Sequence, residues 1–157
     1  VVELFSKHGI LTPVELKARH EILLEDYVKK IQIESRVMGD LAVNHVIPTA
    51  IAYQNKLIQN IRGLKELGLE DEFTQTTLEA IKKMSLHITT IQKNVDAMIE
   101  ARKVANRIED VRERAIMYRE EVFNYFETIR YSVDKLELMV DDEDWPLVKY
   151  RELLFRH

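Results

Sequence analysis

The chain has 157 residues, 46% of them hydrophobic, which is enough for one sizeable core and argues against a disordered tail or a string of domains. Its four glycines and three prolines are far fewer than the turns that a β-barrel or β-sandwich needs, so we expect an all-α fold. The absence of cysteine excludes disulfides, zinc knuckles and thiol chemistry, and the net charge of −4 argues against nucleic-acid binding.

Nothing in the sequence indicates a membrane or export route. No apolar run approaches the roughly 20 residues of a membrane-spanning helix, and no signal-peptide pattern opens the chain. We therefore expect a cytoplasmic location and no membrane partner. Because the first residue is Val1 rather than Met, we also expect the chain to be a piece of a longer protein or a processed product.

The first helix has a clear start signal at Thr12-Pro13-Val14-Glu15. Thr12 and Glu15 have the spacing of a capping box, and Pro13 lies where a missing backbone N–H has little effect. The seam that follows alternates steps of four and three residues: Leu24, Val28, Ile31, Ser35, Met38, Ala42 and His45. We predict a helix over about 13–47, preceded by an entry segment over 1–12.

Pro48 predicts a break, because proline lacks an N–H and disfavours helical geometry in the residue before it. An unbroken helix over 13–67 would be about 80 Å long, and no other segment could cover that length. A second apolar stripe therefore predicts a separate helix over about 49–67, ended by the left-handed cap residue Gly68. Its members are Ala50, Tyr53, Leu57, Ile61 and Leu64.

Two further stripes at the same spacing predict helices over about 72–106 and 109–140. Their phase slips between Met98 and Val111, which indicates either a stammer in one long helix or a turn between Asn106 and Asp110. We favour the turn, because it folds two stripes of matching length against each other. Asp144 is expected to cap a short closing helix over about 146–154. The expected architecture is an elongated antiparallel bundle of about four long helices plus a short C-terminal helix, one domain over 13–157.

Metal chemistry is not supported by the spacing of the histidines. Di-metal carboxylate bundles use Glu-x-x-His pairs, but none of the five histidines has Glu three positions before it. The residues at those positions are Phe5, Lys17, Ala42, Met84 and Leu154. A zinc-protease helix is excluded as well, because His20-Glu21 is followed by Leu24 where the second histidine would stand.

Phosphate and cation sites also have weak support. Gly63 and Gly68 have the glycine spacing of a P-loop, but Leu69-Glu70 replace the required Lys-Ser/Thr. The acidic run 141–144 lacks the alternating oxygen spacing of a calcium loop, so a solvated turn is favoured. His45 could be a ligand or proton carrier, although a hydrogen-bonded core histidine is the favoured interpretation. His20 and His87 are expected at the surface or at the boundary of the core.

Two other groups of side chains have structural explanations. Acidic residues are interleaved with a basic stretch, which favours a helix with many salt bridges over a nucleic-acid surface. The basic residues are Arg102, Lys103, Arg107, Arg112, Arg114 and Arg119. An aromatic stripe could hold a planar ligand, but packing against partner helices is favoured. Its members are Tyr118, Phe123, Tyr125, Phe126 and Tyr131. We therefore expect no catalytic, cofactor-binding or metal-ligating residue in this chain.

Three stretches together resemble the C-terminal helical region of type III glutamine synthetases. Residues 15–22 read Glu-Leu-Lys-Ala-Arg-His-Glu-Ile, residues 27–34 read Tyr-Val-Lys-Lys-Ile-Gln-Ile-Glu, and residues 47–53 read Ile-Pro-Thr-Ala-Ile-Ala-Tyr. The family pattern runs Glu-Leu-x-x-Arg-Tyr-Glu-Ile, then Tyr-x-Lys-Lys-Ile, then Ile-Leu-Pro-Ala. This sequence departs from it at His20, which replaces an aromatic residue, and around Pro48. The distinctive part of the resemblance covers roughly residues 10–60.

The resemblance implies a parent enzyme that joins ammonia to glutamate with ATP and Mg²⁺ or Mn²⁺ in a large homo-oligomer. The catalytic motifs of that family lie upstream of this region, and no residue here matches them, so the chain alone is expected to have no ligase activity. The implied partners are an upstream catalytic domain and other subunits, in a role of assembly or regulation. Two alternatives remain: a free-standing bundle that recruits partner helices, and a sensory bundle with a small ligand between its aromatic residues.

The two ends of the chain are dense in apolar residues. The first eleven positions include Val1, Leu4 and Ile10, and the last eleven include Leu153 and Leu154. We expect these ends either to pack together or to form the surface that meets the rest of the parent protein. Such exposed apolar surface could also drive self-association.

Overall fold

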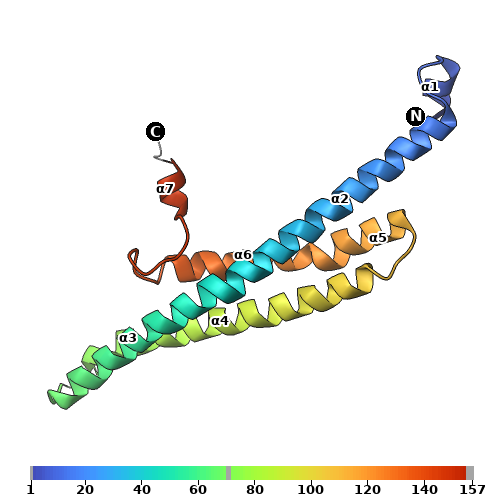
Figure 1. The fold of residues 1–157 in the computed structure, drawn as a ribbon. Coiled ribbons are helices and arrows are strands. Elements are labelled where there is room, and N and C mark those ends of the chain that lie inside the picture. The colour runs from blue at the N-terminus through green and yellow to red at the C-terminus, as the bar shows by residue number, and fades with distance from the viewer. Residues whose placement is uncertain (1, 70–71, 155–157) are drawn as a thin grey trace.

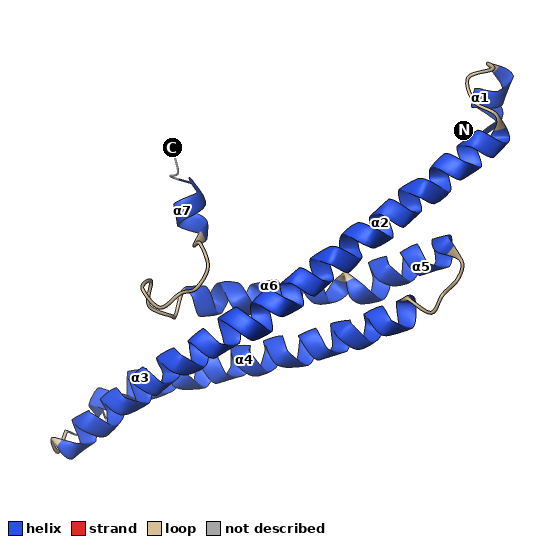
Figure 2. Cartoon of the chain, viewed as in Figure 1, coloured by secondary structure: helices blue, strands red, loops and turns tan. Residues whose placement is uncertain are grey.

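The computed structural model describes residues 2–69 and 72–154, and this part of the chain consists of helices and loops without a strand (Figure 2). The expected all-α class is confirmed. The helical elements, two of them π-helical turns, are α1 (Val2–Lys7), α2 (Pro13–Leu41), η1 (Ala42–Val46), α3 (Ile47–Glu66), α4 (Glu72–Ala105), α5 (Val111–Met117), η2 (Tyr118–Val122), α6 (Asn124–Glu137) and α7 (Tyr150–Leu154).

All of these elements except α1 and α7 form three long antiparallel rods (Figure 1). The first rod is α2, η1 and α3 in one continuous run, the second is α4, and the third is α5, η2 and α6. The second rod packs along α3 and α6, while α2 packs on α5. The result is an elongated bundle, as expected, in which the first two predicted helices are one rod.

The expected break at Pro48 is wrong, because the backbone stays helical through that residue. Ile47 keeps right-handed helical angles, with φ −59° and ψ −50°. In the π-turn η1 the chain makes one wider turn, and the Ile47 N–H donates to the carbonyl of Ala42, five residues back. This wide turn accommodates Pro48, which begins a new stretch of α-helix in its first turn, where the missing N–H is tolerated.

The extra residue of the π-turn also changes which side chains face the core. Beyond Ala42 the buried positions are Val46, Ile47 and Ala50. His45 is therefore rotated out of the seam and is exposed to solvent. The expectation of a core histidine at this position is wrong, because a seam counted at α-helical spacing does not include the inserted residue.

The predicted signals at three other helix ends are confirmed. The Thr12 hydroxyl accepts from the Glu15 N–H at 3.2 Å, and the Glu15 carboxylate accepts from the Thr12 N–H at 2.8 Å, which completes the capping box before Pro13. Gly68 adopts φ +77° just after α3, where an L side chain would be strained. The favoured turn after α4 is also present, and Asp110 caps α5 by accepting from the Glu113 N–H at 2.9 Å.

The core lies along the lines where the rods meet. On α4 the predicted stripe is buried at Met84, Ile91, Val95 and Met98, each at most 1% exposed. On the third rod the predicted stripe is buried as well, with Ala115, Tyr118, Val122, Ile129, Ser132 and Leu136 as its buried members. The hydrophobic spacing therefore identified the inward faces of both rods correctly.

The C-terminal segment differs from expectation. Residues 141–149 form a loop, and α7 covers only Tyr150–Leu154 rather than 146–154. Asp144 does not cap a helix, because its carboxylate accepts hydrogen bonds from the ammonium group of Lys56 on α3 at 2.6 and 2.7 Å. An ion pair to a neighbouring rod has replaced the local cap.

The two apolar ends do not pack together, because α1 and α7 lie at separate places on the molecule (Figure 1). Leu4 and Ile10 are 58% and 62% exposed, and Leu153 and Leu154 are 59% and 63% exposed. Val1 and residues 155–157 lie outside the described residues. The other expected role of the ends, as a surface that meets a larger protein, stays a prediction.

Gly39 on α2 allows the close approach of the first two rods. A Cβ atom built there would lie 3.4 Å from Cγ1 of Val95 and 3.8 Å from Cε of Met98, whereas one built at Gly63 would meet nothing within 4 Å. We expect Gly39→Leu to lower the free energy of unfolding by about 1–3 kcal/mol, because the larger side chain forces the rods apart. The matched variant Gly63→Leu should leave stability unchanged or raise it. Urea denaturation followed by circular dichroism tests both, and equal effects would contradict this account.

Candidate functional site

The described residues contain no assembled metal site. Among residues 2–69 and 72–154, no three His, Cys, Asp or Glu side chains are grouped so that they could hold a metal ion. His20 and His45 are exposed and belong to separate parts of the first rod. His87 is half-buried on α4, and its ring lies 6.3 Å from the ring of Tyr131 on α6.

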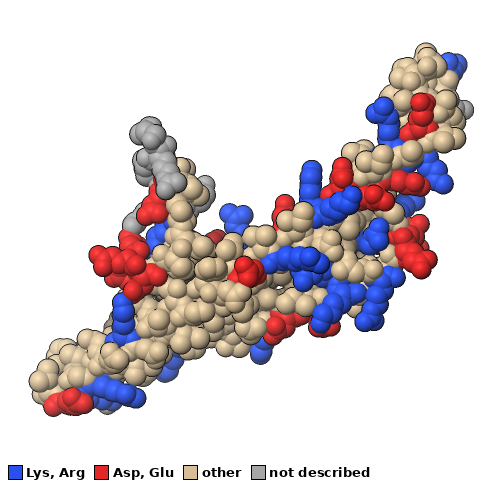
Figure 3. Space-filling view, in the orientation of Figure 1, with Lys and Arg blue, Asp and Glu red and all other residues tan. Residues whose placement is uncertain are grey.

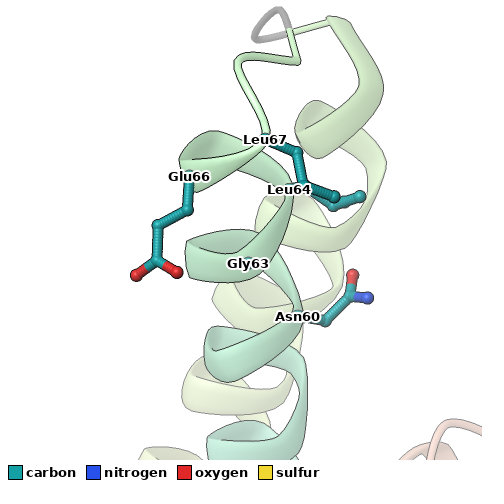
Figure 4. A pocket seen from close by; sticks show the side chains of 5 residues that line it. All are labelled: Asn60, Gly63, Leu64, Glu66 and Leu67. Carbon is teal, nitrogen blue, oxygen red and sulfur yellow. The ribbon is translucent and has the colours of Figure 1, made fainter.

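The two glycines with P-loop spacing lie at the end of the first rod and do not form a phosphate cradle. Figure 4 shows an open hollow of about 470 Å³ beside Gly63, lined also by Asn60, Leu64, Glu66 and Leu67. Glu66 points away from the other labelled side chains, and the lining contains no basic side chain. The predicted roles of these glycines, helix flexibility and a C-cap, fit this geometry better than phosphate binding.

The acidic run 141–144 is tied to lysines rather than arranged around a cation. Asp141 accepts from the Glu143 N–H at 2.8 Å, Asp144 pairs with Lys56, and Asp142 forms an ion pair with Lys149. Lys149 is only 8% exposed and donates to the carbonyl of Glu137 at 3.1 Å, at the end of α6. The loop is therefore fastened to two rods by charge-assisted hydrogen bonds.

The aromatic residues pack in several different environments. Tyr118 is fully buried and donates to Oδ1 of Asn106 at 2.7 Å, and burial raises the pKa of its hydroxyl above the usual value. Phe123 and Phe126 contact each other with ring centroids 5.1 Å apart. Tyr131 is 58% exposed beneath the ammonium group of Lys135. Their side chains do not converge on one planar cavity. The favoured packing interpretation holds for Tyr118 but not for Phe123 and Tyr131, which are 46% and 58% exposed.

The basic stretch that joins α4 to α5 forms fewer ion pairs than expected. Of its six basic side chains, only Lys103 pairs with an acidic residue of the described chain, at 2.7 Å from Glu100. Nε of Arg114 is buried without a hydrogen-bond partner. Charged side chains of both signs nevertheless gather over the half of the molecule near α1 and α5 (Figure 3). The expected helix with many salt bridges is therefore wrong, although the charges do alternate in sign.

The best-formed apolar surface is a groove between the first and third rods. It encloses about 450 Å³, and Glu34 and Arg130 are the charged residues of its lining. Its other lining residues are Ile33, Val37, Met38, Leu41, Ala42, Val46, Phe126, Ile129, Val133 and Leu147. This groove was not predicted from the sequence, because Ile33 and Val37 lie beside the predicted seam. Their four-residue spacing was the available signal.

Within the described residues, no helix is both long enough and apolar enough to cross a membrane.

The fold defines the class of the protein as an elongated α-helical bundle. Residues 1–65 match the family described as glutamine synthetase C-terminal domain, and the chain is similar to glutamine synthetases over nearly its whole length. The expected resemblance is thereby confirmed.

Several curated relatives extend the similarity over nearly the whole chain. Glutamine synthetase of Bacteroides fragilis (strain YCH46) is 48% identical over 149 residues, which cover 93% of this chain and 20% of the relative. Type-3 glutamine synthetase of Dictyostelium discoideum is 30% identical over 98% of this chain and 21% of its own length. Glutamine synthetase of Butyrivibrio fibrisolvens is 29% identical over 98% and 22%. The chain thus spans about a fifth of the length of these relatives.

Lys149 should stabilise the loop that carries Leu147 to the groove. We expect Lys149→Met to lower the free energy of unfolding by about 1–3 kcal/mol, because the carbonyls at the end of α6 lose a charged donor. The exposed Lys82 on α4 provides the control, and Lys82→Met should change stability by less than about 0.5 kcal/mol. Urea denaturation of both variants is the measurement. A Lys149→Met protein as stable as the control would show that the loop does not depend on this lysine.

His87 should make the stability of the bundle depend on pH. Burial first, and then the charge of Lys135, lower the pKa of His87 below its usual value. As the pH falls, His87 therefore takes up a proton at a higher pH in the unfolded chain than in the folded chain. The resulting stability is complete above the ordinary histidine pKa of about 6.5 and is lost as the pH falls toward the lower folded value.

We expect His87→Gln to weaken the fall in unfolding free energy between about pH 7.5 and pH 5.5. Chemical denaturation at a series of pH values measures this slope. Leu86→Gln, at the exposed neighbouring position, is the control and should keep the slope of the parent chain. An unchanged slope in His87→Gln would show that this histidine does not titrate differently in the folded state.

Proposed function

We propose that this chain is the non-catalytic C-terminal helical domain of a type III glutamine synthetase. In this proposal it packs against the catalytic body and supports assembly or regulation of the enzyme. The similarity to three glutamine synthetases supports the assignment. The parent reaction, ATP-dependent ligation of ammonia to glutamate with Mg²⁺ or Mn²⁺, would then take place outside these residues.

The observation that carries the docking role is the first half of α2, residues 13–27, which we call the arm. Its N-terminal part extends beyond the other rods (Figure 1), its partly buried Leu24 and Tyr27 pack against the core, and the first buried residue along α2 is Val28. Three large apolar side chains of the arm are nevertheless exposed: Val14 by 78%, Ile22 by 57% and Leu23 by 67%. Exposed apolar side chains on an isolated helix favour burial against a partner.

The most economical partner for the arm is the remainder of a glutamine synthetase. The arm lies within the part of the chain that matches the family, and the relatives are about five times as long as this chain. A domain attached to so large a body meets it at high effective concentration, so modest apolar contacts suffice to hold the two together.

Enzyme assays test the non-catalytic part of the proposal. We expect the 157-residue chain alone to show no glutamate-dependent or ammonia-dependent ATP hydrolysis, whereas the glutamine synthetase that carries this bundle should consume ATP when both substrates are present. Turnover by the isolated chain would overturn the assignment.

Substitution within the arm tests the docking role. We expect the double variant Ile22→Glu, Leu23→Glu to leave the unfolding transition of the isolated chain unchanged, because both side chains are exposed there. In the full-length enzyme it should raise the concentration at which the oligomer dissociates by at least about tenfold, since each buried apolar side chain contributes about 1.5–3 kcal/mol. Sedimentation velocity measures this dissociation.

The polar residue His20 lies on the same arm and gives the matched variant, because it is also exposed. His20→Glu adds one negative charge without removing apolar surface, and the oligomer should keep its dissociation behaviour. If the Ile22, Leu23 variant assembled as well as His20→Glu did, the arm would not be a docking surface. A free-standing interaction bundle would then be the better description.

A further inference from the structure

A second cavity lies between α2 and α4, where Gly39 brings the first two rods together. Its volume is about 280 Å³, just below the usual range for ligand pockets. Its apolar lining comes from Gly39, Val43, Val95 and Ile99. Because Gly39 has no side chain, the α2 backbone itself forms part of the wall. The remaining lining residues are polar or charged.

Two guanidinium groups line one end of this cavity. Arg36 comes from α2 and Arg102 from α4, and Nη1 of Arg102 donates to the Ser35 hydroxyl at 3.3 Å. Neither forms an ion pair with a carboxylate of the described residues. Partial burial and the charge of Arg36 lower the pKa of Arg102. Two like charges that share a partly desolvated cavity favour an anionic group between them.

Two carboxylates line the other end of the charged part of the cavity, before Val43 and Gln92. Asp40 accepts a hydrogen bond from the Asn44 amide, and Asp96 accepts one from the Gln92 amide at 3.0 Å, so each is held by its own rod. Because the rods are antiparallel, Asp40 lies about 6 Å beyond Arg36 and Asp96 about 9 Å beyond Arg102 in the same direction. The charged part of the cavity therefore has a positive and a negative end.

We propose that this cavity binds a short dipolar molecule, of the ω-amino acid class, with its carboxylate between Arg36 and Arg102 and its ammonium group between Asp40 and Asp96. Arginine suits a carboxylate because its planar fork donates two parallel hydrogen bonds. A methylene chain between the two charges would lie along Gly39 and Ile99. Phosphate and other polyanions are disfavoured by the aspartates, and metal cations by the arginines.

A series of probes with increasing charge separation tests the proposal. Glycine, β-alanine, γ-aminobutyrate and ε-aminohexanoate separate carboxylate and ammonium by one, two, three and five methylene groups. We expect the two longest to bind at least tenfold more tightly than glycine, and to shift the amide resonances of Gly39 and Val95. Titration of the 157-residue chain, followed by nuclear magnetic resonance, gives both the affinity and the location. Propionate, propylamine and inorganic phosphate carry one kind of charge each and should bind at least tenfold more weakly than γ-aminobutyrate.

Substitutions at each end of the site test which residues bind the carboxylate of the ligand and which bind its ammonium group. Arg102→Gln and Asp96→Asn should each weaken binding of γ-aminobutyrate at least tenfold. Asp96→Asn should leave propionate binding unchanged, because it removes only the partner of the ammonium group. Arg62→Gln, at an exposed position of α3 away from the cavity lining, should bind like the parent chain.

Three results would overturn the proposal: no binding by any member of the series, equal binding of phosphate or propionate, or unchanged affinity in the variants at both ends. If Arg102→Gln failed to fold, Arg36→Gln and Asp96→Asn would decide the outcome, since both residues are exposed.

Discussion

The structure depends on the burial of one apolar stripe, that of α4, between the other two rods. The stripe is almost completely removed from water at Met84, Ile91, Val95 and Met98. Both α3 and α6 lie along α4, so this helix joins the first rod to the third. Burial along narrow stripes produces a long molecule with a thin core. Large exposed apolar side chains such as Leu23 and Val37 are a direct consequence of this shape.

The two π-turns keep the apolar stripes of the first and third rods facing the core. An α-helix of 3.6 residues per turn slowly rotates its seam relative to a repeat of 3.5 residues. Each π-turn inserts one residue, and its buried members remain on the inward face: Ala42 and Val46 in η1, Tyr118 and Val122 in η2. In the first rod the same turn places Ala42 and Val46 along the apolar groove. One local irregularity thus sets both the core and the groove.

Local signals in the sequence were sufficient for the helices and their inward faces. The capping box at Thr12, the left-handed Gly68 and the stripes of α4 and the third rod all rest on interactions within a few turns of helix. Pro48 and His45 were misjudged because a π-turn has no sequence signature that α-helical spacing can detect. Asp144 was misjudged because its partner, Lys56, is distant in the sequence.

The surfaces were harder to predict than the core, for a physical reason. The groove and the cavity near Gly39 arise where two rods approach, so their lining combines residues from helices that the sequence does not place in register. Arg36 and Arg102 come from different rods, and only the crossing brings them to the same cavity. The charges along α4 alternate in sign, and this pattern gave no reason to distinguish Arg102 from the charged residues beside it in the sequence.

The continuity of the first rod through Pro48 has a mechanical consequence. Its three parts, α2, η1 and α3, have 29, 5 and 20 residues without an interruption, a length of roughly 80 Å. The rod is held at the close crossing near Gly39 and along its packing on α5, and only the part toward Thr12 is free. A small rotation of the held part would therefore be amplified into a larger displacement at Thr12, because the helix between them is stiff.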